Sequence, residues 1–141
     1  MFVRMFKPQF ARLVELGMKR QTVRPTPKRM PLRGDRISLR AWSDKPYRSP
    51  QRILREAIIS EVVSIRIEKG RIWVAGQSHI TKYPQRSSGD QTLDSFAMAD
   101  GFESWDAMEA WFQYQHGLPF EGVLICWTNA KGDSQSPANN L

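Results

Sequence analysis

The sequence predicts an α+β fold in which several β-strands are accompanied by a few short helices. Alternating apolar and polar residues mark strands at several places along the 141 residues. The helical segments are few and short, and they do not alternate regularly with strands as in a doubly wound sheet. The length suits one globular domain, as do 40% hydrophobic and 25% charged residues. We therefore expect a mixed sheet or a small barrel.

The N-terminal region predicts a strand followed by a helix. Met1–Phe6 alternates weakly between apolar and basic residues, which is typical of a strand. Lys7–Leu16 carries an apolar stripe at helical spacing and has Pro8 at a first helical position. Gly17 can adopt the left-handed conformation that ends a helix.

The next region predicts one strand between two basic loops. The prolines of residues 25–31 exclude regular structure from the first loop, which ends at the turn Gly34-Asp35. Arg36–Trp42 alternates apolar with polar or basic residues and predicts a half-buried strand with a basic face. Lys45–Arg52 is expected to form the second basic loop.

The middle of the chain predicts a β-hairpin and an exposed loop. Ile58–Ile67 and Arg71–Ala75 are β-branched runs on either side of Lys69-Gly70, a pattern typical of a hairpin. His79–Gly89 is polar and contains small residues, so we expect it to be a loop on the surface.

The C-terminal part predicts two short helices and a last strand. Thr92 is expected to cap a helix that closes at Asp100-Gly101, and Ser104 a second helix over Trp105–His116. Phe120–Asn129 is an apolar run typical of a buried strand.

One domain is expected over residues 1–130, followed by a polar tail over 131–141 that has no reason to order. No apolar stretch is long enough to span a bilayer, and basic residues interrupt the N-terminus, so we expect a cytoplasmic protein. The lone Cys126 lies in the last strand, which favours a buried, inert thiol and excludes an internal disulfide.

Positive charge is concentrated in the N-terminal part of the chain. Residues 1–55 hold 15 of the 21 Lys and Arg residues against three acids, whereas residues 56–141 carry a net charge of −5. A block of one sign indicates a polyanion partner. Arginine binds phosphate and stacks on bases, and exposed aromatic rings offer a stacking platform. The predicted binding residues are Arg20, Arg24, Lys28, Arg29, Arg40, Trp42, Lys45, Tyr47, Arg48 and Arg52.

A motif after the first predicted helix resembles a known family signature. Residues 17–24 read Gly-Met-Lys-Arg-Gln-Thr-Val-Arg and resemble the G-x-K-x-x-T-x-R signature of ASCH domains. The resemblance continues, in order, at Gly34-Asp35, Phe96-Ala97, Asp100-Gly101-Phe102, Trp111-Phe112 and Gly122–Trp127. It implies a PUA-like β-barrel with flanking helices, and a cleft suited to RNA or a nucleobase.

The resemblance also implies a set of catalytic residues. Some small bacterial members of the family are amidohydrolases that remove the acyl group from N4-acetylcytidine, and others are reported as ribonucleases. The working lysine, threonine and glutamate of the amidohydrolases fall on Lys19, Thr22 and Asp100. Asp100 departs from the family glutamate, because its carboxylate sits about 1.5 Å further back, which can slow a reaction considerably.

The catalytic interpretation requires a particular backbone conformation between Lys19 and Thr22. Thr22 would attack an amide carbonyl, Lys19 would take its proton, and Asp100 would donate a proton to the leaving amine. Residues three apart on a strand point to opposite faces, so residues 18–21 should not be a strand. The structural alternative is that Lys19 meets the dipole of a helix end, Thr22 favours a strand, and Asp100 ends a helix.

Three functions remain open from the sequence. The first is a hydrolase acting on a modified pyrimidine nucleoside or the same base in RNA. The second is an RNA-binding module without chemistry, and the third is a ribonuclease in which Lys19 stabilises the phosphorane. We expect no metal site and no cofactor, because His79 and His116 lie outside any ligand-spaced cluster and no nucleotide-binding loop is present.

Overall fold

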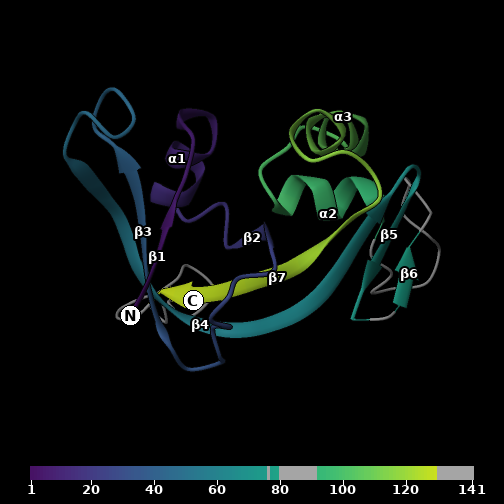
Figure 1. Ribbon diagram of the computed structural model, residues 1–141, viewed down its shortest axis with the longest axis horizontal. Helices are drawn as coiled ribbons and strands as arrows, with labels where there is room; N and C mark the ends of the chain where they lie inside the picture. The colour runs from purple at the N-terminus through teal and green to yellow at the C-terminus, as the bar shows by residue number, and fades with distance from the viewer. Residues whose placement is uncertain (76, 80–91, 130–141) are drawn as a thin grey trace, which may run out of the picture. The chain divides into compact units, whose positions relative to one another are not determined.

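The computed structural model describes residues 1–75, 77–79 and 92–129, and every structural statement below concerns these residues. Three helices occur, α1 (Pro8–Glu15), α2 (Leu93–Ala99) and α3 (Trp105–Gln115). The strands are β1 (Phe2–Met5), β2 (Gln21–Pro25), β3 (Arg36–Trp42), β4 (Gln51–Glu68), β5 (Arg71–Val74), β6 (Gln77–His79) and β7 (Phe120–Asn129) (Figure 1).

The predicted α+β class is confirmed. Within the described residues the strands form one sheet in the order β1-β3-β4-β5-β6, while β7 pairs with β4 and with β2. β1 runs parallel to β3, and the pairs β3–β4, β4–β5 and β5–β6 are antiparallel. These pairings do not join the ends of the sheet into a closed ring.

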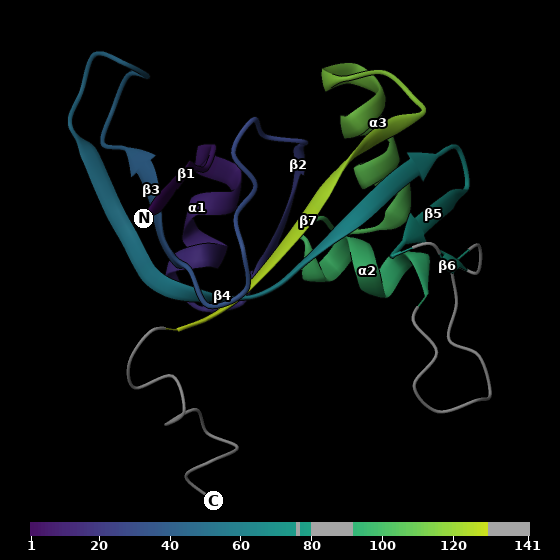
Figure 2. The same ribbon diagram turned by 60° about the horizontal axis from the view of Figure 1, so that its bottom comes forward.

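The described chain groups into two compact units. The first comprises Met1–Arg20, Pro31–Val62 and the described residues from Cys126 onward. Here α1 lies beside β1 and β3 in both views (Figures 1 and 2). The buried residues of α1 are Phe10, Ala11 and Val14. Of the apolar stripe predicted from the sequence, Phe10 and Val14 are buried and Leu13 is half-buried. Ile37 and Leu39 of β3 are also fully buried, so this unit has an apolar core of its own.

The second unit comprises Gln21–Met30 and Val63–Ile125. Both predicted helix caps are confirmed, since Thr92 accepts a hydrogen bond from the Ser95 amide and Ser104 from the Ala107 amide. The two helices lie side by side (Figure 2). Their largest buried side chains are Phe96, Trp105, Met108 and Phe112.

The structure corrects two predictions of loops. β4 begins at Gln51, inside the predicted basic loop Lys45–Arg52, and pairs with β3 from the register Trp42↔Gln51 onward. Basic residues concealed this strand, because they occupy exposed positions of a sheet whose hydrogen bonds are made by the backbone. His79 lies in β6 and pairs with Ile72, so it does not begin a loop. The rest of that predicted loop and the tail 131–141 lie outside the described residues.

The approach of β2 to β7 depends on Gly122. A Cβ atom at this position would lie 2.9 Å from Phe120 Cζ and closer still to the carbonyl oxygen of Arg24. Backbone atoms cannot move away without disturbing the pairing of the two strands. The absence of a side chain at Gly122 is therefore a condition for holding β2 against β7.

We predict that Gly122→Ala lowers the free energy of unfolding by at least about 2 kcal/mol, because the added methyl group overlaps with backbone. Gly70→Ala is the control: Gly70 has φ +72° with no atom within 4 Å of the added Cβ. It should cost only about 1 kcal/mol of backbone strain. Urea denaturation of both variants checks the order, and an equal or smaller loss for Gly122→Ala would contradict this account.

Candidate functional site

The C-terminal end of α1 leads the chain to Lys19. Gly17 has φ +79°, a left-handed conformation that favours glycine. The amides of Met18 and Lys19 then donate to the Leu13 carbonyl at 2.9 and 3.0 Å. Residues 18–20 are not in a strand, as the catalytic interpretation requires, but Gln21 already belongs to β2.

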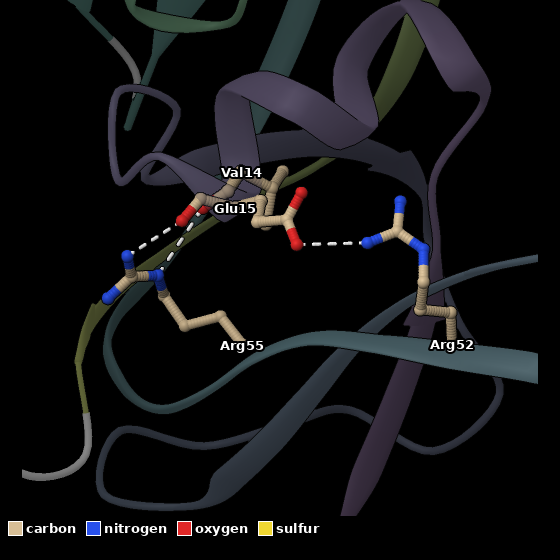
Figure 3. A network of polar contacts seen from close by, with 4 residues as sticks. All are labelled: Val14, Glu15, Arg52 and Arg55. Carbon is tan, nitrogen blue, oxygen red and sulfur yellow. Dashed lines mark hydrogen bonds and ion pairs between the residues drawn. The ribbon is translucent and has the colours of Figure 1, made fainter.

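Two arginines of β4 hold the end of α1 (Figure 3). Arg55 Nη2 donates to the carbonyl oxygen of Glu15 at 2.9 Å, and its Nε donates to the carbonyl oxygen of Val14 at 3.3 Å. Arg52 Nη1 forms an ion pair with the Glu15 carboxylate at 2.9 Å. Arg52, a predicted nucleic-acid-binding residue, is therefore partly neutralised by its neighbour.

We predict that Arg55→Met lowers the free energy of unfolding by about 1–2 kcal/mol, because two backbone carbonyls at a helix end lose a charged donor. Arg52→Met should cost less than about 1 kcal/mol, since its ion pair with Glu15 is exposed to solvent. Thermal unfolding of both variants tests this ranking, and the reverse order would show that the helix end does not depend on Arg55.

Lys19 is buried in the first unit, with only 3% of its surface exposed. Its Nζ lies 5.2 Å from the centre of the Phe10 ring and 5.9 Å from that of Phe6. These distances permit cation–π attraction, which offsets part of the cost of removing an ammonium group from water. The amine of Lys19 thus occupies an environment where little water competes for it.

Thr22 and Asp100 are both buried in the second unit, with exposures of 4% and 3%. Arg24 Nε donates to Thr22 Oγ1 at 3.0 Å, so a positive guanidinium faces the hydroxyl oxygen. Asp100, the residue that ends α2, accepts a hydrogen bond from Gln21 Nε2 at 3.4 Å. This contact brings the carboxylate of Asp100 to the residue immediately before Thr22.

Few polar side chains are buried in the part of the chain that the structure describes. They belong to Lys19, Thr22, Ser38, Thr92 and Asp100. Thr92 caps a helix and Asp100 ends the same helix, while Ser38 accepts a hydrogen bond from Arg40 Nε at 2.8 Å in the same arrangement that joins Thr22 to Arg24. Thr92 and Ser38 were not predicted as site residues. The other three are the residues at which the sequence predicts catalysis. Burial of a polar group costs free energy unless its bonds to water are replaced.

The predicted binding residues fall into two groups by unit. Arg40, Trp42, Lys45, Tyr47, Arg48 and Arg52 lie on the β3–β4 hairpin of the first unit. Arg20, also in the first unit, donates to the Gly17 carbonyl at 3.1 Å. In the second unit, Lys28 and Arg29 are exposed, whereas Arg24 is half-buried and faces Thr22.

A pocket in the second unit is lined by residues that the sequence did not single out for a site. Its volume is about 420 Å³, and its lining residues are Thr26, Ser64, Ile65, Arg66, Trp73, Glu121 and Gly122. Arg66 donates to the Glu68 carboxylate at 2.7 Å and to the Glu121 carboxylate. Arg66 and Glu68 are oppositely charged and two residues apart in a strand, so the sequence pattern alone could have predicted that their side chains pair on one face of the strand. Glu121 is 55 positions from Arg66, and no local sequence pattern could have predicted its contact with Arg66.

Hydrogen bonding to Arg66 lowers the pKa of Glu68 below its ordinary value of 4.5. The folded state therefore favours the carboxylate more than the unfolded state does. This contribution to stability is complete above the unfolded pKa and is lost as the pH falls through the lowered folded pKa.

We predict that wild type and Glu68→Gln differ most in melting temperature near neutral pH, and that the difference shrinks as the pH falls below about 4. Melting curves measured between pH 7 and pH 3 check this. A difference that stays constant or grows toward acid pH would contradict the assigned role of the carboxylate.

The described residues contain no group of three or more His, Cys, Asp or Glu that could hold a metal ion. None of their helices is both long and apolar enough to cross a membrane. No family model matches this chain, and neither curated proteins nor solved structures provide a match.

Proposed function

We propose that this chain is a hydrolase of the ASCH type, with a PUA-like barrel fold, that removes the acyl group from N4-acylated cytidine. The observation that carries the proposal is the burial of Lys19, Thr22 and Asp100, three polar residues at the positions where the ASCH resemblance implies catalysis, with Asp100 in place of the family glutamate. The Nζ atom of Lys19 lies near the aromatic rings of Phe10 and Phe6.

Thr22 is the nucleophile in this proposal. The ASCH resemblance assigns to its hydroxyl oxygen the attack on the acyl carbonyl, and to the neutral amine of Lys19 the role of the general base that takes up the hydroxyl proton. The guanidinium of Arg24, which donates to Thr22 Oγ1 at 3.0 Å, stabilises the negative charge that develops as the proton leaves. Attack by a weak nucleophile requires this kind of activation.

Asp100 is the acid that releases the cytidine. As the tetrahedral intermediate collapses, the bond between the acyl carbon and N4 breaks, and the protonated carboxyl of Asp100 donates its proton to N4. The hydrogen bond from Gln21 orients this carboxyl. Water then attacks the acyl-threonine ester: the carboxylate of Asp100 takes a proton from this water, and the ammonium of Lys19 returns its proton to Thr22 Oγ1. The carboxylic acid is released, and Thr22, Lys19 and Asp100 regain their starting protonation states.

We predict that the protein deacylates N4-acetylcytidine and that Lys19→Ala lowers the rate by about 100-fold or more, because general base catalysis is lost. Lys69→Ala is the control, since Lys69 is an exposed lysine in the β4–β5 turn. Product formation is followed by chromatography, and circular dichroism verifies that each variant folds. Full activity of a folded Lys19→Ala variant would refute the role of Lys19.

A labelled single-stranded RNA, incubated in parallel, distinguishes the two alternatives. Cleavage of the RNA that disappears in Lys19→Ala, without deacylation, would replace the proposal with a ribonuclease. Binding of RNA that weakens steeply with salt, without turnover of either substrate, would leave a binding module.

A further inference from the structure

The loop that joins β3 to β4 is held by a dense set of hydrogen bonds. The amide and the hydroxyl of Ser43 both donate to the Pro50 carbonyl, at 2.9 and 2.7 Å. The hydroxyl of Ser49 accepts from the Asp44 amide at 3.0 Å and donates to the Lys45 carbonyl at 2.8 Å. These hydrogen bonds across the loop hold its backbone in one conformation.

Tyr47 stands at the tip of this loop in an unusual conformation. Its φ is 63°, a left-handed value that a bulky residue rarely adopts. The side chain is nevertheless 88% exposed, so burial does not compensate for the strain. Its ring packs against Trp42, with ring centres 5.1 Å apart and planes at 48°. Strain that presents an aromatic ring to solvent points to a binding role.

The hairpin that carries this ring is rich in positive charge. Residues 36–52 contain five Lys and Arg and one acid, Asp44. Arg40 is held by Ser38 and by Gln51, whose Oε1 accepts from Arg40 Nη1 at 2.9 Å. Lys45 and Arg48 are exposed, and within the described chain their side chains form no hydrogen bond or ion pair. The hairpin therefore carries an exposed cation before and after the exposed ring of Tyr47 in the sequence.

We infer that this hairpin is a docking surface for single-stranded nucleic acid, with one base stacked on Tyr47 and phosphates bound by Lys45 and Arg48. An exposed ring can stack only on a base that has left its own stack, which excludes an intact duplex. The flanking cations match the phosphates on either side of such a base. The surface lies wholly within the first unit and does not depend on the proposed hydrolysis.

Tyr47→Asn tests the stacking, because asparagine tolerates left-handed φ and keeps the loop conformation. We expect the affinity for a twelve-nucleotide oligouridine, measured by fluorescence anisotropy, to fall about 10-fold. Tyr114→Asn is the matched control, since Tyr114 is 86% exposed on α3, and it should leave the affinity unchanged. Unchanged affinity in a folded Tyr47→Asn variant, or equal losses in both variants, would overturn the inference.

An abasic strand of equal length separates stacking from simple attraction between charges. We expect it to bind wild type about as weakly as oligouridine binds Tyr47→Asn, and equal affinity of wild type for both strands would overturn the inference. Arg48→Gln should reduce the slope of log affinity against log salt by about 0.7. The affinity for an oligothymidine of equal length shows whether the surface prefers RNA or DNA. An acidic peptide that binds as tightly as oligouridine would contradict the assignment of a nucleic-acid partner.

Discussion

The pairing of β2 with β7 is the constraint on which the candidate site depends. β2 is short, and in the described sheet its hydrogen-bonding neighbour is β7. Gly122 permits the close approach of the two strands, and the Trp127 amide fixes the preceding chain by donating to the Arg20 carbonyl at 3.1 Å. The backbone from Arg20 to Arg24 is thereby fixed, and Thr22 and Arg24 project from one face of the strand, where their side chains bond.

The candidate site residues are polar side chains that the fold buries. The amine of Lys19, the hydroxyl of Thr22 and the carboxyl group of Asp100 belong to residues with less than 5% exposure, and their burial costs free energy because each group loses contact with water. Aromatic rings near Lys19, the guanidinium near Thr22 and the amide near Asp100 offset part of this cost. Apolar residues would fill the same volume at lower cost, and this cost is the reason why we propose a catalytic role for these groups.

Local signals in the sequence predicted much of the fold. Thr92 and Ser104 marked the helix starts, because a hydroxyl before a helix satisfies its first amides. The alternation of Arg36–Trp42 predicted β3 at its observed bounds. The early start of β4 was missed, because its pairing with β3 is a backbone interaction between residues whose side chains are basic and exposed.

Features that join distant residues could not be predicted. The bond between Gln21 and Asp100 spans 79 positions, and the ion pair of Arg66 with Glu121 spans 55. Neither has a local pattern, so the pocket in the second unit was also missed. The left-handed backbone of Tyr47 was unpredictable for another reason, since tyrosine has no preference for that conformation.

The proposed reaction passes through an acyl group on the hydroxyl of Thr22, and mass spectrometry can detect this intermediate directly. Protein mixed with N4-acetylcytidine is quenched in acid within milliseconds to seconds and digested. The account predicts one acetyl group on the peptide that carries Thr22, and none on that peptide in Thr22→Val. Turnover of the substrate with no acetylated peptide at any time, or with the acetyl group on Lys19, would contradict it.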